Sequence, residues 1–286
     1  MHWVVATLLM FVASIVLYLS VRRASLDKLP VHFNNLASFS VPLTLFTVGA
    51  LITRQSFVLS LREAGILLVS GVFLSYLANK FSLKSIELAP NPGYSLVISK
   101  SYVVMTAFLA VPLFGAHLSV TSLVAIALIV GFAALIMLGS GERHRAKSTA
   151  WLPLAFLAFF GWGFLTLVAK YLFSQGMSPV VFLIYTELVV VTCILIEMYR
   201  KRVLTRSITK HIKPFVLIGL CSAAFNFFHF TAISLAPNVG YVNATNAASI
   251  AAVTVFAALL FKDDLSIKKV IGVFGVTTGL FLLFLG

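Results

Sequence analysis

The chain has 286 residues, of which 60% are hydrophobic and only 10% are charged. A mean hydropathy of +1.06 excludes an ordinary water-soluble domain and predicts an integral membrane protein. The net charge of +13 does not indicate a nucleic-acid partner, because the basic residues form short clusters between apolar runs, as they do in the loops of membrane proteins.

A helix that crosses a membrane needs about 20 mainly apolar residues. Ten such runs follow one another along the chain, at residues 3–20, 36–53, 64–81, 91–114, 119–139, 151–173, 178–198, 214–234, 239–261 and 267–285. Each run is continuously apolar rather than alternating, which favours helices over barrel strands. The first run is interpreted as a span and not as a secretory signal, because its basic pair, Arg22 and Arg23, follows the apolar residues.

A short motif occurs twice. Leu-Ala-Pro-Asn-Pro-Gly-Tyr at residues 88–94 recurs as Leu-Ala-Pro-Asn-Val-Gly-Tyr at residues 235–241, about half the chain later. Asn79 and Asn226 correspond at the same offset. We therefore expect two homologous halves, residues 1–140 and 151–286, with five helices each. Because five is odd, the second half enters from the opposite side, and the fold is expected to be an all-α bundle of two inverted five-helix repeats.

The repeated motif predicts a tight break between the third and fourth helices of each half. Proline removes an amide donor and disfavours helix in the residue before it, while Asn and Gly tolerate turn conformations. The motif is either a plain helical hairpin turn or part of a gate on the transport pathway. The residues assigned to this turn are Pro90, Asn91, Gly93, Tyr94, Pro237, Asn238, Gly240 and Tyr241.

The basic residues predict the orientation. The segments that follow the first, third, fifth, seventh and ninth runs carry 17 of the 21 lysines and arginines, and the other face has only Arg54 and Arg62. By the positive-inside rule the rich face is cytoplasmic, and both termini lie outside a plasma membrane that the chain crosses many times.

Two charged residues lie deep inside predicted spans, where an unpaired charge is costly. Lys100 is either a side chain that extends to the interface or a ligand for an anionic group in a central cavity. Glu187 is the only acid near the middle of a span. It is expected to pair with Lys100, to bind a substrate amine or to carry a proton.

Neutral polar residues suggest a cavity wall. Asn226 and His229 are three residues apart, as are Asn243 and Asn246, so each pair shares a helix face. Such amides either bind a substrate or simply join neighbouring helices. Trp162 lies between two glycines and is assigned to the pocket or to helix packing. Together with Lys100, Glu187 and Tyr241, these five complete the predicted substrate-binding set.

The way each half closes carries a family resemblance. Leu113–Ser119 and Leu260–Ser266, together with the repeated motif, resemble the drug/metabolite transporter superfamily in its ten-span form with two EamA-type domains. The resemblance covers essentially the whole chain and implies a transporter of unspecified substrate. The first half departs from the family's ending, because Ala116 and His117 stand where an acid is usual and only Asp263 fills that place. Family members usually keep both termini cytoplasmic, which conflicts with the charge distribution.

The sequence has no glycine-rich phosphate loop, no metal-binding motif and no evident catalytic group, so we expect neither an enzyme nor a cofactor. The predicted function is secondary transport of a small polar or amphipathic metabolite, first of all an amino acid, by alternating access. A proton or an exchanged substrate would drive it, lipids would surround it, and the oligomeric state stays open. The alternatives are a flippase or membrane enzyme for a lipid-linked substrate, and a membrane scaffold that transports nothing.

Overall fold

The computed structural model describes residues 1–89, 92–138, 149–202, 211–263 and 265–285, and these residues form helices and turns without strands. The helices of the first half are α1 (Trp3–Leu26), α2 (Val31–Ile52), α3 (Leu61–Val69), η1 (Ser70–Leu77), α4 (Ala78–Leu88), α5 (Pro92–Lys100), α6 (Tyr102–Phe114) and α7 (Val120–Leu138). Those of the second half are α8 (Trp151–Ser174), α9 (Pro179–Arg200), α11 (Ile212–Leu235), α12 (Val239–Phe261) and α13 (Ile267–Leu285).

Two of the long helices are irregular. The segments α3, η1 and α4 form one continuous helix that contains a π-helical stretch, and α5 and α6 form a second helix that is broken at Ser101. The described residues therefore contain ten helices that are long and apolar enough to cross a membrane. This confirms the predicted number of spans and the all-α fold class.

Several helices extend beyond their apolar runs. The first continues to Leu26 and the third to Leu88, so Lys80 and Lys84, which were counted among the 17 basic residues of the predicted segments between runs, lie on α4. The prediction was wrong there because hydropathy detects only the hydrocarbon-spanning part of a helix. Lysine stems are apolar and their ammonium groups reach water, so a helix continues past the apolar core without cost.

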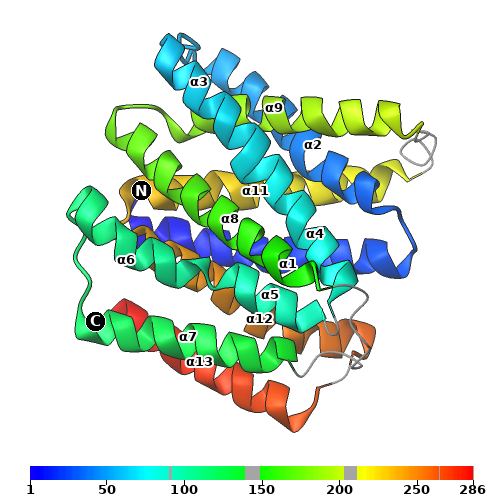
Figure 1. The fold of residues 1–286 in the computed structure, drawn as a ribbon, viewed down its shortest axis with the longest axis vertical. Coiled ribbons are helices and arrows are strands. Elements are labelled where there is room, and N and C mark those ends of the chain that lie inside the picture. Colours follow the sequence, from blue (N-terminus) through cyan, green and yellow to red (C-terminus); the bar gives the residue numbers. More distant parts are fainter. Residues whose placement is uncertain (90–91, 139–148, 203–210, 264, 286) are drawn as a thin grey trace.

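The chain ends on one side of the bundle. Figure 1 shows both termini on the left, together with the α6–α7 and α8–α9 turns, whereas the α1–α2 turn lies on the right. The α11–α12 turn, which contains the second copy of the repeated motif, is also on the left. Successive spans thus run in opposite directions. Because their number is even, both termini lie on the same side.

Corresponding positions of the two halves adopt the same backbone conformation. Gly115 and Lys262, which are related by the same offset as the two motifs, both end a helix in the left-handed region, with φ of 62° and 58°. Pro30 precedes α2 and Pro179 begins α9, so proline starts the second helix of each half.

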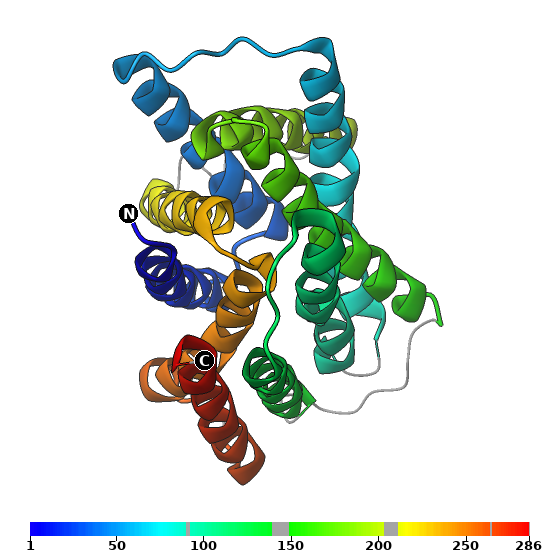
Figure 2. The ribbon, with the colours of Figure 1, turned by 90° about the vertical axis from the view of Figure 1, so that its left-hand side faces the viewer.

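The two halves interlock. The first helix of each half packs mainly against the other half: α1 contacts α11 and α12, and α8 contacts η1, α4, α5 and α6. Helix α2 packs against α9, and α7 packs against α13 (Figure 2). Reciprocal contacts of this kind are what an approximate two-fold axis between inverted repeats produces.

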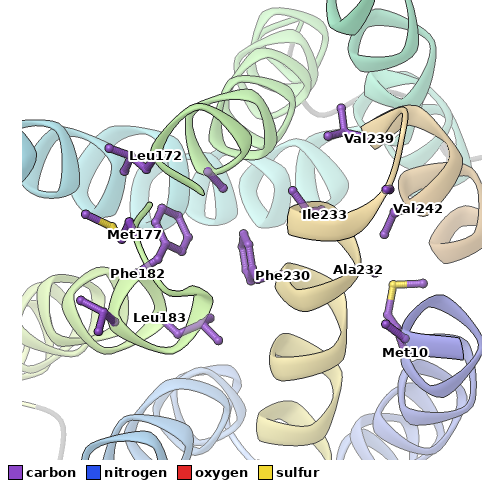
Figure 3. Close-up of a cluster of buried hydrophobic side chains, with 14 of the residues drawn as sticks. Met10, Leu172, Met177, Phe182, Leu183, Phe230, Ala232, Ile233, Val239 and Val242 are labelled. Carbon is purple, nitrogen blue, oxygen red and sulfur yellow. The ribbon is translucent and has the colours of Figure 1, made fainter. Parts of the chain in front are cut away.

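The interior between α8, α9 and α11 is filled by apolar side chains. Phe182 and Leu172 are fully buried, and the Phe182 and Phe230 rings have their centroids 5.0 Å apart (Figure 3). Within the described residues, the polar side chains at membrane depth thus lie between well-packed blocks.

Candidate functional site

A cavity of about 880 Å³ lies between α2, α4, α8 and α9. Its walls come from the first turns of α2, from η1 and α4, from the start of α8 and from the second half of α9, so it lies at the lysine-rich end of the bundle. The lining residues are Val31, His32, Asn35, Phe39, Tyr76, Asn79, Lys80, Phe81, Leu83, Lys84, Ile86, Glu87, Leu154, Val190, Ile194, Glu197, Met198 and Lys201. This volume falls within the range of small-molecule sites, which is roughly 300–1,000 Å³.

The charged part of the cavity wall is centred on Glu197. Its Oε1 atom is 3.1 Å from Nζ of Lys80 and 2.6 Å from Nζ of Lys201, and its Oε2 atom accepts a 2.5 Å hydrogen bond from the Tyr76 hydroxyl. The Lys80 ammonium also lies 5.7 Å from the centroid of the Tyr76 ring. We name Tyr76, Lys80, Glu197 and Lys201 the mouth cluster. It connects η1 and α4 of the first half with α9 of the second.

Neutral polar groups lie on the wall as well. Asn79 donates a 3.4 Å hydrogen bond to Oδ1 of Asn35, and both side chains are half-buried. Asn79 is the repeat counterpart of Asn226, so the two halves place an amide at the same position of their third helices. The cavity wall therefore combines a large apolar area with amides and a charged cluster.

Glu187 lies one turn deeper than the cavity along α9. Residues Val190, Ile194 and Glu197 line the cavity from one face of this helix, and Glu187 continues that face toward the middle of the span. Glu187 is 2% exposed, and its Oε1 accepts a 3.1 Å hydrogen bond from Nδ2 of Asn226. In the described part of the chain, Oε2 has no hydrogen-bond partner.

The predicted amides and histidine form a buried relay. Nε2 of His229 lies 3.2 Å from Oδ1 of Asn243, and Nδ2 of Asn243 donates a 3.0 Å hydrogen bond to the Thr106 hydroxyl. Asn226 is one helical turn from His229, and Asn246 is one turn from Asn243. The polar residues of α9, α11 and α12 thus follow one another across the middle of the bundle.

Lys100 lies at the end of this series. Its ammonium is 4.4 Å from the centroid of the Trp162 ring, a cation–π contact, and the Trp162 and Tyr102 rings meet edge-on with centroids 6.3 Å apart. Lys100 also lines a pocket of only about 10 Å³, which it shares with Tyr18, Tyr102, Val103, Asn243, Asn246, Ala247 and Ile250. That volume holds one water molecule at most.

Pairing of Lys100 with Glu187, one of the three roles considered for Glu187, is not formed in the described residues. Within the described residues, Glu187 is bonded to Asn226 and Lys100 lies over Trp162, with no ion pair between them. The sequence could not foresee this, because α5 and α9 are brought together only through α8 and α11.

The second copy of the repeated motif closes the opposite end of the bundle. The Asn238 side chain caps α12 by accepting a 2.8 Å hydrogen bond from the Gly240 amide, and its Nδ2 donates a 3.2 Å hydrogen bond to the Ala107 carbonyl of α6. The Tyr241 hydroxyl donates a 2.9 Å hydrogen bond to the His117 carbonyl. A Cβ on Gly240 would overlap Ala107, so only glycine permits this approach.

Lys170 of α8 also binds this turn through its ammonium group. Nζ of Lys170 on α8 donates to the carbonyls of Ile233, Ser234 and Ala236, at distances of 3.1, 3.1 and 2.8 Å. These carbonyls end α11 immediately before Pro237, where the helix has no further amide donors for them. Lys170 therefore caps α11.

The first copy of the motif is described only in part. Pro90 and Asn91 lie outside the described residues. Gly93 is buried, and Tyr94 is half-buried with its ring centroid 6.4 Å from that of Trp151. The hydroxyl groups of Ser95 and Ser85 are 2.7 Å apart, which connects α5 to α4 at this end.

The structure thus does not bring the predicted substrate residues together in one cavity. Lys100, Asn243 and Asn246 line the small pocket, whereas Trp162, Glu187, Asn226, His229 and Tyr241 line neither of these two cavities. Sequence reasoning missed the wall of the large cavity, above all His32, Asn35, Tyr76, Lys80 and Glu197. The sequence pattern that could have indicated this wall is helical spacing, because Tyr76 and Lys80 are four residues apart, as are Glu197 and Lys201.

Comparison with known proteins agrees with this architecture. Residues 149–285 match the EamA-like transporter family. An uncharacterized transporter of Archaeoglobus fulgidus is 26% identical over 232 residues, which cover 80% of this chain and 78% of that protein. The second half of the chain is therefore similar to the EamA-like transporters, and most of the chain is similar to a protein named as a transporter.

A solved structure gives the same fold. It matches with a TM-score of 0.78 at 12% sequence identity, over 98% of this chain and 97% of that one. At this identity the likeness supports the fold and says nothing of the substrate. The EamA-like second half contains Glu187, His229, the second copy of the motif and half of the mouth cluster. These similarities point to membrane transport, and any substrate must be inferred from the chain's own residues.

Proposed function

We propose that this protein is a secondary transporter that moves a small polar or amphipathic metabolite across the plasma membrane by alternating access. An amino acid is the first candidate. The observation that carries the proposal is the large cavity at the lysine-rich end, combined with the closed α11–α12 turn at the opposite end. In alternating access, the protein is open to one side of the membrane and closed to the other in each of its two end states, and this arrangement fits one of those states.

The composition of the wall supports this substrate class. Phe39, Phe81, Ile194 and Met198 provide apolar surface for the body of a metabolite, while Asn35 and the mouth cluster provide hydrogen bonds and charge. A purely polar solute would leave the apolar surface without contacts, and a purely apolar one would displace water from Asn35 and the mouth cluster without offering hydrogen bonds in return. An amphipathic metabolite satisfies both.

We propose that the deeper polar residues form a second substrate-binding site along the pathway. In the cycle, the substrate moves from the cavity to the polar series that includes Glu187, Asn226, His229, Asn243 and Lys100. The α11–α12 turn then separates from α6, and the cavity end closes. Lys100 and Glu187 orient charged substrate groups or bind a coupling proton, and the asparagines provide neutral hydrogen bonds.

The orientation follows from the distribution of charge. We propose that the lysine-rich end is cytoplasmic and that both termini lie outside. The energy source is an ion gradient or an exchanged metabolite, because the sequence contains no phosphate-binding loop. The partners are a small-molecule substrate, the surrounding lipids, and a proton or exchange substrate, without nucleic acid.

Counterflow tests the proposal. Purified protein is reconstituted in liposomes that are loaded with a panel of unlabelled amino acids and other amphipathic metabolites, and uptake of the matching labelled compound is measured. We expect transient accumulation of at least one compound above protein-free liposomes. Protein that is folded and correctly inserted but gives no counterflow with any member of the panel contradicts the proposal.

A further inference from the structure

We propose that the mouth cluster is a binding site for a carboxylate group, and hence that the transported metabolite is an amphipathic carboxylate. Because the cavity is a substrate site only in a transporter, this assignment rests on the proposed function and names the charged group of its substrate.

The charges of the cluster do not balance. The ammonium groups of Lys80 and Lys201 both approach the same oxygen, Oε1 of Glu197, while Oε2 is occupied by the Tyr76 hydroxyl. Two positive charges thus share a single carboxylate, which leaves one positive charge without a partner. A second carboxylate is the group that neutralises it with charge-assisted hydrogen bonds.

The remaining charges of the cavity do not supply that second carboxylate. Lys84 and Glu87 also line the cavity, and Nζ of Lys84 lies 3.0 Å from both oxygens of Glu87. Glu87 therefore has a lysine of its own. Across the described wall, three lysines face two glutamates, and His32 adds only neutral or positive charge.

Both ammonium groups are accessible from the cavity. The Lys80 and Lys201 side chains are 49% and 64% exposed, whereas the Glu197 side chain is 25% exposed. An incoming carboxylate can therefore reach the lysines without breaking the hydrogen bond from Tyr76. Beside the cluster, Ile194 and Met198 offer apolar contacts to the body of the same molecule.

A set of three matched probes isolates the charged group. 3-Phenylpropanoate, 3-phenylpropanamide and 2-phenylethylamine share an aromatic body and carry a carboxylate, a neutral amide and an ammonium group. Their dissociation constants for the purified full-length protein in detergent are measured by thermal shift and by calorimetry. We expect the carboxylate to bind about three- to tenfold more tightly than the amide, with the amine weakest, and its advantage to fall as salt is raised.

Variants of the cluster give effects of opposite sign. Lys80→Gln and Lys201→Gln each remove an ammonium group and should weaken carboxylate binding about three- to tenfold. Glu197→Gln removes the internal competitor and should strengthen carboxylate binding instead. A purely structural role would weaken binding in all three variants. Lys28→Gln, which changes an exposed lysine of the α1–α2 turn outside the cavity, is the matched control and should leave the affinity unchanged.

The outcomes separate this assignment from the proposed function. Equal affinity for the three probes, absence of binding by all of them, or weaker carboxylate binding in Glu197→Gln overturns the carboxylate site. Carboxylate selectivity with the expected signs supports it. Counterflow of metabolites that lack a carboxylate would overturn the assigned substrate class while leaving the transport function intact.

Discussion

The side-chain amide of Asn226 donates a 3.1 Å hydrogen bond to Oε1 of Glu187, and no described residue bonds to Oε2 of the same carboxyl group. Glu187 is 2% exposed and lies in the middle of α9, just beyond the cavity. A buried carboxyl group with one amide partner and no cation is costly to maintain, since burial penalises polar groups that lack partners. A carboxyl group that costs stability at this depth favours a role in transport over a role in stability.

The first prediction concerns Glu187. Glu187→Gln keeps an oxygen that can accept from Asn226, so the unfolding temperature in detergent should stay close to that of the wild type. Glu187→Ala leaves the Asn226 amide without its acceptor and should cost about 1–3 kcal/mol. Both variants should lower counterflow at least about tenfold, the loss produced by roughly 1.4 kcal/mol of transition-state energy. Unchanged flux in Glu187→Gln would remove this residue from the pathway.

The second prediction concerns Lys100 and Trp162. Trp162→Phe preserves an aromatic face for the ammonium, whereas Trp162→Leu removes it and with it a contact worth about 0.5–2 kcal/mol. We expect counterflow to fall in the order wild type, Trp162→Phe, Trp162→Leu, and to fall at least about tenfold in Lys100→Ala. Lys28→Ala serves as a lysine control outside the spans. If Lys100→Ala transports like the wild type, the assignment of Lys100 to the site is wrong.

The third prediction concerns Gly240. A methyl group at this position would overlap the backbone and side chain of Ala107, so Gly240→Ala must push α12 away from α6. Thermal unfolding should show a loss of about 1–3 kcal/mol, the usual cost of overpacking. Gly49→Ala is the control, because a Cβ there meets no atom within 4 Å. In a helix that substitution should be neutral or stabilise by up to about 1 kcal/mol. Equal behaviour of the two variants would show that the contact is not tight.

The fourth prediction concerns Lys170. Lys170→Met removes the donor to three carbonyl groups at the end of α11 while preserving the apolar stem. Because the side chain is half-buried, we expect a loss of about 1–2 kcal/mol in the free energy of unfolding. The α11–α12 turn should also exchange its backbone amides faster. Hydrogen exchange measured by mass spectrometry over residues 233–241 checks this, and unaltered exchange there would speak against a role for Lys170 in holding the turn.

The fifth prediction concerns orientation. Alkaline phosphatase fused to the C-terminus is active only outside the cytoplasm, and green fluorescent protein fused to the same place fluoresces only inside. The excess of basic residues on one face predicts active phosphatase and no fluorescence for this chain. The reverse result would place the lysine-rich cavity at the outer surface, in agreement with the topology that is usual in the superfamily that the sequence resembles.

Much of the fold could be predicted because its determinants are local. Continuous apolar runs long enough to cross a bilayer indicate ten helices, and each run overlaps one of the ten apolar helices of the described residues. The two copies of the motif predicted helix breaks, and the structure has one between Leu235 and Val239. The break at Ser101 inside the fourth span and the π-helical stretch η1 were not predicted from the sequence.

The sequence alone thus predicted ten helices long and apolar enough to cross a membrane, because hydropathy, proline and glycine act within a few residues of their own position. Which polar groups come into contact depends instead on how the helices pack. Lys80 and Glu197 are more than a hundred residues apart and become partners because η1 and α4 pack beside α9. A Lys100–Glu187 pair was one of the possibilities that the sequence offered, yet Lys100 lies over the Trp162 ring of α8 and Glu187 accepts a hydrogen bond from Asn226 of α11. Charges in a membrane pair with whatever the helix packing brings within hydrogen-bonding distance, and that packing is a property of the whole bundle.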